Sequence, residues 1–99
     1  MAYQGWSNYE TWLFWAHMSN DGFWYDSMNE MAQEIIAEDS DAYDLANRLQ
    51  DFMNDEIYAR VDATLHPIIV DILEAIFVEV DWREIADYVL SDAKEAAEL

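Results

Sequence analysis

Hydrophobic residues recur along most of this chain at the three- and four-residue intervals of amphipathic helices. The clearest example is the segment 23–37, whose apolar positions are Trp24, Met28, Met31 and Ile35. Comparable stripes follow at Leu45, Leu49, Phe52 and Met53, and at Ile85, Ala86, Val89 and Ala93. Only two glycines and one proline are available for hairpins. The pattern predicts an all-α fold, a small single-domain bundle of about five helices over residues 1–99.

Side chains that cap helices indicate where the helices begin. The predicted caps are Ser7 with Glu10, Ser40 with Asp41, and Asp81 with Glu84, and the first break falls at Asn20, Asp21 and Gly22. The first helix is expected over 7–19, the third to follow its cap, and the last to follow Asp81. For the segment 57–65, two alternatives stay open: it continues the third helix or forms a loop.

Residues 68–80 differ from the other segments because they are apolar on nearly every side. Pro67 precedes them, and proline is well tolerated in the first turn of a helix. A helix without a polar stripe is typical of a position inside the core. The segment is therefore expected to form the central buried helix, and a β-strand over 76–80 is the alternative.

This chain is far more acidic than an ordinary helical bundle. It has 22 acidic and 4 basic residues, and its net charge is −18. Five Trp, six Tyr and four Phe argue against disorder. A domain of this length is about 30–35 Å across, and duplex DNA carries one charge per about 1.7 Å. The chain thus matches a short piece of DNA in charge and length. Adaptation to high salt is the alternative explanation of the acidity, and Lys94 as the only lysine is consistent with it.

The acidic residues form a regular series on the second predicted helix. Asp26, Glu30, Glu34 and Glu38 are spaced by four, which stacks them at intervals of about 6 Å. Like charges at this spacing repel by about 0.2–0.5 kcal/mol per pair, and a solvated face normally includes lysines. Together with acidic residues that follow, they are predicted to form a partner-binding edge, called here the acidic surface. Its members are Asp26, Glu30, Glu34, Glu38, Asp39, Asp41, Asp44, Asp51, Asp55 and Glu56.

No catalytic residue, metal site or cofactor is predicted. The chain has no cysteine, so thiolate chemistry and zinc–thiolate sites are excluded. A calcium loop beginning at Asp39 would need glycine where Asp44 stands and glutamate where Gln50 stands. The two histidines, His17 and His66, lie on different predicted segments, and no phosphate-binding glycine loop or nucleophile motif occurs.

The expected location is the cytoplasm. No signal peptide is expected, and the apolar runs 12–16 and 75–78 are far too short to cross a bilayer. An anionic surface is repelled by nucleic acid and by acidic lipids, so direct binding to either is not expected. The partner should instead be a basic protein.

Aromatic residues crowd the N-terminal segment: Tyr3, Trp6, Tyr9, Trp12, Phe14 and Trp15. One short helix in a small bundle cannot bury aromatic side chains on so many of its faces. Most should belong to the core, and Phe14 and Tyr3 are expected at an interface, either in a homodimer or with the target.

Two stretches carry a resemblance to a known family. Residues 8–12 read Asn-Tyr-Glu-Thr-Trp, and residues 80–86 read Val-Asp-Trp-Arg-Glu-Ile-Ala. They resemble the two motifs of a family of small proteins found in phages, plasmids and some archaea, which implies a mobile-element setting and no particular activity. In charge, size and helicity, the chain is also similar to phage-encoded DNA mimics that inhibit restriction and CRISPR systems, with no shared motif.

The leading hypothesis is a non-enzymatic, DNA-mimicking inhibitor that occupies the DNA-binding groove of a host defence nucleoprotein, either a CRISPR effector or a restriction enzyme. If the chain is phage-encoded, it would act in the host cytoplasm. The alternative is a small acidic adaptor or structural protein that binds a protein partner through exposed aromatics, its acidity serving solubility or salt adaptation. A mimic requires an acidic stripe uninterrupted by the basic residues Arg48, Arg60, Arg83 and Lys94.

Overall fold

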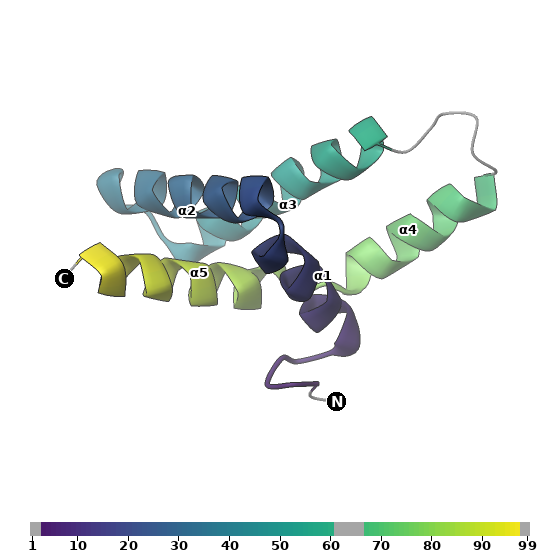
Figure 1. Ribbon diagram of the computed structural model, residues 1–99, viewed down its shortest axis with the longest axis horizontal. Coiled ribbons are helices and arrows are strands. Elements are labelled where there is room, and N and C mark those ends of the chain that lie inside the picture. The colour runs from purple at the N-terminus through teal and green to yellow at the C-terminus, as the bar shows by residue number, and fades with distance from the viewer. Residues whose placement is uncertain (1–2, 61–66, 98–99) are drawn as a thin grey trace.

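The computed structural model describes residues 3–60 and 67–97. The described chain forms the helices α1 (Tyr9–Asn20), α2 (Gly22–Ala37), α3 (Ala42–Arg60), α4 (Pro67–Glu79) and α5 (Trp82–Ala97), arranged as shown in Figure 1. No β-strand occurs in this part of the chain, which confirms the predicted all-α fold. No helix in the described ranges is both long and apolar enough to span a membrane.

Three helices, α2, α3 and α5, pack against one another and form the core. Each contributes the apolar face that its sequence spacing predicts. The buried residues include Met28, Ala32 and Ile35 from α2, Leu45, Leu49 and Met53 from α3, and Ile85, Ala86 and Val89 from α5. Helix α1 crosses beside this core (Figure 1) and contributes the fully buried Met18.

Helix α4 is not the central buried helix, so that prediction is wrong. None of its residues is buried, and Ile68, Ile72 and Val78 are 58%, 51% and 78% exposed. Of the described helices, only α1 approaches α4 closely, and Figure 1 shows α4 extending away from the three-helix core.

The carboxylates of α4 give a physical reason for its position. At about 100° per residue, Asp71, Glu74 and Glu79 span about 140° of its circumference. Burial on all sides would take at least one unpaired carboxylate out of water, at a cost of several kcal/mol. Only the opposite face, with Leu73, Ile76 and Phe77 among its members, is therefore partly buried.

Asp41 and Asp81 cap α3 and α5 as predicted, whereas Ser40 does not cap and instead donates to Asp44, and the cap of α1 differs from the prediction. Its N-cap is Asn8, whose side chain accepts a hydrogen bond from the Thr11 amide. Ser7 does not cap α1, and its amide instead donates to Glu84. Aspartates cap α2, α3 and α5: Asp21 accepts from the Trp24 amide, Asp41 from the Asp44 amide, and Asp81 from the Glu84 amide.

The fold also bears on three further sequence interpretations. Helix α3 continues through Arg60, so the first part of the segment 57–65 is helical, and its remainder lies outside the described residues. The segment 76–79 is helical, so the β-strand alternative is wrong. Phe14 is half-buried and packs edge-to-face on Phe77 and Trp82, with ring centroids 5.7 and 5.6 Å away, so it belongs to the packed interior. Tyr3 is 37% exposed and packs on Tyr9 and Trp12.

Candidate functional site

The acidic surface is divided between two sides of α2. Each step of four residues advances about 40° beyond a full turn, so the four carboxylates rotate by about 120° around the helix. Asp26 and Glu30 line a shallow hollow of about 810 Å³ between α2 and α5, to which Asp92 also contributes. Glu34 and Glu38 lie on the side of α3. The series is therefore not one straight row of charges.

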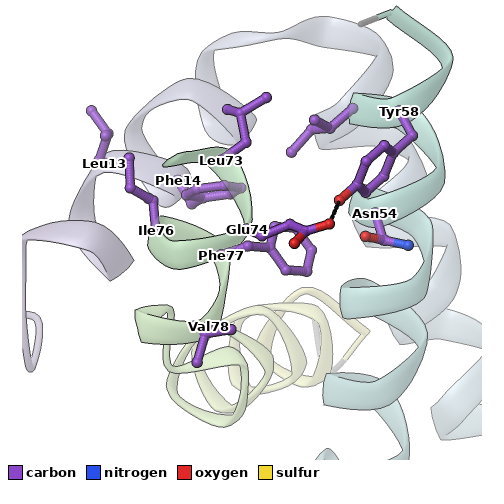
Figure 2. Close-up of a pocket in the computed structure, with 10 residues that line it drawn as sticks. Leu13, Phe14, Asn54, Tyr58, Leu73, Glu74, Ile76, Phe77 and Val78 are labelled. Carbon is purple, nitrogen blue, oxygen red and sulfur yellow. Dashed lines mark hydrogen bonds between the residues drawn. The ribbon is translucent and has the colours of Figure 1, made fainter. Parts of the chain in front are cut away.

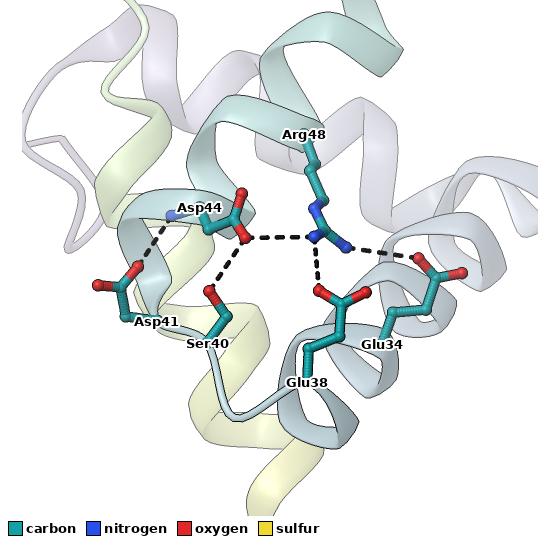
Figure 3. A network of polar contacts seen from close by, with 6 residues as sticks. All are labelled: Glu34, Glu38, Ser40, Asp41, Asp44 and Arg48. Atoms are coloured by element: carbon teal, nitrogen blue, oxygen red, sulfur yellow. Dashed lines mark hydrogen bonds and ion pairs between the residues drawn. The ribbon is translucent and has the colours of Figure 1, made fainter.

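Arg48 of α3 forms ion pairs with three carboxylates of the predicted site (Figure 3). Its guanidinium Nη2 lies 2.6 Å from Glu38 Oε2 and 3.2 Å from Asp44 Oδ2, and Nη1 lies 3.6 Å from Glu34 Oε2. The hydrogen bond with Glu38, assisted by the charge of Asp44, raises the pKa of Arg48 above its ordinary value. Ser40 donates a further hydrogen bond to Asp44. This cluster joins α2 to α3 and interrupts the acidic surface with a cation. The uninterrupted stripe that a mimic was expected to need is therefore not present at Arg48, and the carboxylates that stay unpaired among the described residues lie on either side of this cluster.

The remaining members of the acidic surface are more open. Asp26, Glu30, Asp51 and Asp55 are exposed, and none forms an ion pair with a described residue. Asp41 is exposed and caps α3, and Glu56 is partly buried. Arg83, the other cation with a described ion pair, lies 3.2 Å from Asp87 on α5, away from these residues. Asp26, Glu30, Asp51 and Asp55 therefore carry negative charge that no described cation compensates.

Asp39 places a carboxylate where helices commonly have glycine. It follows the C-cap of α2 with φ of 55°, in the left-handed region. Its amide donates to Ile36, and the next amide, of Ser40, donates to Ile35. Glycine reaches this conformation at no steric cost, whereas aspartate tolerates it less well. The exposed turn between α2 and α3 therefore keeps its negative charge at some conformational cost.

The longest dimension of the molecule exceeds the diameter expected for a domain with this number of residues. Its principal extents are 47 × 30 × 22 Å, against the 30–35 Å expected. A net charge of −18 along 47 Å is one charge per about 2.6 Å, compared with one per about 1.7 Å in duplex DNA. The overall charge density along the long axis is thus about two thirds that of DNA.

The two stretches that carry the family resemblance contact each other. Asn8 Nδ2 donates to the Glu79 carbonyl at 2.8 Å, and its Oδ1 accepts from Thr11 at 2.8 Å (N) and 2.6 Å (Oγ1). Thr11 is fully buried, and its Oγ1 accepts from the Asp81 amide at 2.8 Å. These residues lock the start of α1 to the turn between α4 and α5. These contacts were not predicted from the sequence, although Asn8 followed three residues later by Thr11 is a spacing typical of an N-cap.

An apolar groove between α1, α3 and α4 was also not predicted (Figure 2). It has a volume of about 520 Å³, and its lining includes Leu13, Ile57, Leu73, Ile76, Phe77 and Val78. Figure 2 shows Tyr58 and Glu74 reaching toward each other from α3 and α4. The Tyr58 hydroxyl donates to Glu74 Oε1 at 2.7 Å.

The Tyr58–Glu74 hydrogen bond should make the stability of the contact between α3 and α4 depend on pH. It raises the pKa of Tyr58 above its ordinary value. A raised pKa means that the stabilisation is fully present below about pH 10, the ordinary tyrosine value, and is lost as pH rises through the raised value. Between pH 8 and pH 11, the parent should lose more thermal stability than Tyr58→Phe does, whereas the exposed control Tyr43→Phe should behave as the parent. Equal losses in all three would contradict this role for Tyr58.

The part of the chain that the structure describes contains no metal site built from histidine and carboxylate side chains. No cluster of three or more His, Asp or Glu side chains in this part of the chain is arranged to hold a metal ion. His17 is exposed on α1, and His66 lies outside the described residues.

Comparison with known proteins adds no relative: protein-family models, curated proteins and solved structures all returned no match to this chain.

Proposed function

We propose that this protein is a non-enzymatic inhibitor that binds a basic, DNA-binding protein or nucleoprotein of its host through the acidic surface and competes there with DNA. The observation that carries the proposal is the uncompensated charge on α2 and α3. Asp26, Glu30, Asp51 and Asp55 are exposed and unpaired among the described residues, and Arg48 is already neutralised by the protein's own carboxylates. A groove that binds DNA phosphates is lined by lysine and arginine side chains, and these would form ion pairs with the unpaired carboxylates.

The mode of action would be electrostatic. A surface of one sign attracts an oppositely charged groove over a long range and accelerates association. Because the charge density is lower than that of DNA, the protein would not reproduce DNA along its whole length. Its acidic surface would instead block one segment of the groove, and the bulk of the bundle would exclude the rest of the duplex.

A CRISPR effector or a restriction enzyme is the target class that we propose, in keeping with the resemblance to small phage and plasmid proteins. Both classes bind DNA through channels or clefts lined by Lys and Arg. Such a target would place the protein in the host cytoplasm.

A second candidate function is an adaptor that binds a protein partner through apolar side chains, its acidity serving solubility. The exposed apolar residues Ile72 and Val78 favour it. An adaptor would leave the DNA-binding activity of its partner intact, which separates the two candidates.

The test is DNA cleavage by a panel of purified restriction enzymes and CRISPR effectors, with and without this protein. At least one enzyme should be inhibited, and an excess of non-cleavable duplex DNA should relieve the inhibition. Inhibition should also weaken as salt rises, because charge attraction is screened over about 8 Å at physiological ionic strength. Inhibition that excess DNA does not relieve would contradict competition, and an unaffected panel would contradict the proposed target class.

A further inference from the structure

We infer that a hollow formed by Trp6, Glu84 and Tyr88, called here the aromatic corner, binds the guanidinium group of an arginine side chain from a protein partner. The inference does not rest on competition with DNA, because none of these residues belongs to the acidic surface. It is carried by the side chains that line the hollow itself: two aromatic rings and one carboxylate, with no basic side chain among the described lining residues.

The two rings present their faces to the hollow at a distance that suits one cation. The hollow is shallow, has a volume of about 310 Å³, and includes Trp6 from the N-terminal segment and Tyr88 from α5 in its lining. The ring planes are inclined by 54° and the centroids lie 5.6 Å apart, so neither ring lies flat on the other, and Tyr88 is 52% exposed. The face of an aromatic ring attracts a cation that lies within about 6 Å of its centroid. A single cation in the hollow can therefore contact both rings.

A tight turn in the N-terminal segment positions Trp6. Tyr3 and Trp6 exchange two backbone hydrogen bonds, of 2.6 and 2.7 Å. Between them, Gln4 and Gly5 have φ of 50° and 89°, and positive φ at both central residues is typical of a type I′ hairpin turn. Glutamine seldom adopts positive φ, so this turn forms at some conformational cost.

Contacts with α1 and α5 hold the aromatic corner together. The ring centroid of Trp15 on α1 lies 5.4 Å from that of Trp6 and 4.8 Å from that of Tyr88. The Ser7 amide donates to Glu84 Oε1 at 3.0 Å, which joins the N-terminal segment to α5. The rings and the carboxylate are thus in place before a ligand binds, which lowers the entropic cost of binding.

The carboxylate of Glu84 selects the kind of cation. Its Oε1 accepts from the Ser7 amide, whereas its Oε2 forms no hydrogen bond or ion pair with a described residue. The neighbouring Arg83 pairs with Asp87 at 3.2 Å and does not line the hollow. A guanidinium group stacks on aromatic rings, donates to carboxylates and is more weakly hydrated than the ammonium group of lysine. A quaternary ammonium group has no N–H to donate to Oε2.

The charge of the chain indicates where the arginine comes from. Free arginine carries a carboxylate of its own, which Glu84 and the net charge of −18 would repel. In a polypeptide, that carboxylate has become part of a neutral peptide bond. The occupant is therefore an arginine side chain of a protein.

The test titrates the isotope-labelled protein with acetyl-arginine amide at about 0.15 M salt and follows its amide and indole NMR signals. The Trp6 indole and Tyr88 amide signals should shift with a roughly millimolar Kd, and acetyl-lysine amide should bind more weakly. Tyr88→Leu should weaken binding of the arginine compound by about two- to fivefold. The matched control Tyr43→Leu removes a ring that is 65% exposed on α3, and it should bind as the parent does.

A second pair of variants tests the carboxylate. Glu84→Gln should weaken binding by up to about fivefold, whereas Glu95→Gln, which removes the same charge from an exposed position on α5, should not. Glutamine keeps an oxygen for the Ser7 amide, so this pair tests the inference even if circular dichroism shows that Tyr88→Leu is unfolded.

Three outcomes would overturn the inference. Equal affinity of Glu84→Gln and Glu95→Gln would attribute binding to the overall negative charge. Equal affinity of folded Tyr88→Leu and Tyr43→Leu would remove the aromatic contact. Tighter binding of free arginine than of acetyl-arginine amide would make the small molecule, and not a protein, the ligand. DNA competition is measured separately, so either proposal can fail alone.

Discussion

Replacing Asn8 with Ala is expected to lower the free energy of unfolding by about 2–3 kcal/mol. The loss of an N-cap accounts for about 1 kcal/mol. The remainder follows because the buried hydroxyl of Thr11 would lose its acceptor, whereas the Glu79 carbonyl is exposed and can bind water instead. Polar groups that are left unsatisfied in a part-buried site cost about 1–3 kcal/mol.

The matched control is Asp21→Ala, which removes the cap of α2 and nothing else that joins distant segments. It should cost only about 1 kcal/mol in urea unfolding. Asn8→Asp keeps the cap oxygen but loses the donor to Glu79, so its stability should lie between those of the parent and Asn8→Ala. Equal losses for Asn8→Ala and Asp21→Ala would mean that the lock between α1 and the α4–α5 turn contributes nothing beyond a cap.

Neutralising Asp26, Glu30, Asp51 and Asp55 together, as Asn or Gln, is expected to weaken binding to the DNA-binding partner by about 10- to 100-fold. Exposed ion pairs contribute about 0.2–1 kcal/mol each, and each 1.4 kcal/mol is a tenfold change in affinity. These four carboxylates are chosen because they make no described ion pair. Glu34 and Glu38 are left unchanged, since their loss would also release Arg48.

The control for this variant neutralises Asp71, Glu79, Asp87 and Glu95, which are exposed on α4 and α5 and do not line the hollow of Asp26 and Glu30. Both variants have the same net charge, so long-range steering is matched and any difference reports local contacts. Calorimetric titration of the partner should show the large loss only for the α2–α3 variant. Equal losses would mean that net charge alone, and not the acidic surface, governs binding.

The core could be predicted from the sequence because α2, α3 and α5 each have one apolar stripe and charged residues elsewhere. In such helices, the spacing of the apolar residues identifies the buried face directly, as at Leu45, Leu49 and Met53. For α4, apolar residues on every side indicated burial, but its three carboxylates cannot all be buried. The spacing of apolar residues alone does not show that full burial would remove carboxylates from water.

From the sequence, the members of the candidate site could be named, but their arrangement in space could not be predicted. The i, i+4 spacing was read as a straight row, whereas the helical advance carries Glu34 and Glu38 round to α3. Asp44 and Arg48 are a local i, i+4 pair, but Arg48 lies ten residues after Glu38, so no local pattern linked it to the carboxylates of Glu34 and Glu38. The lock at Asn8 joins segments about 70 residues apart, and only the folded chain brings them together.

The most direct test of competition with DNA is the fluorescence anisotropy of a labelled duplex bound to the inhibited partner, followed as this protein is added. Complete displacement is expected, with a midpoint that rises in proportion to the concentration of competing unlabelled duplex. A complex that retains the duplex and this protein together would contradict occupation of the DNA-binding groove.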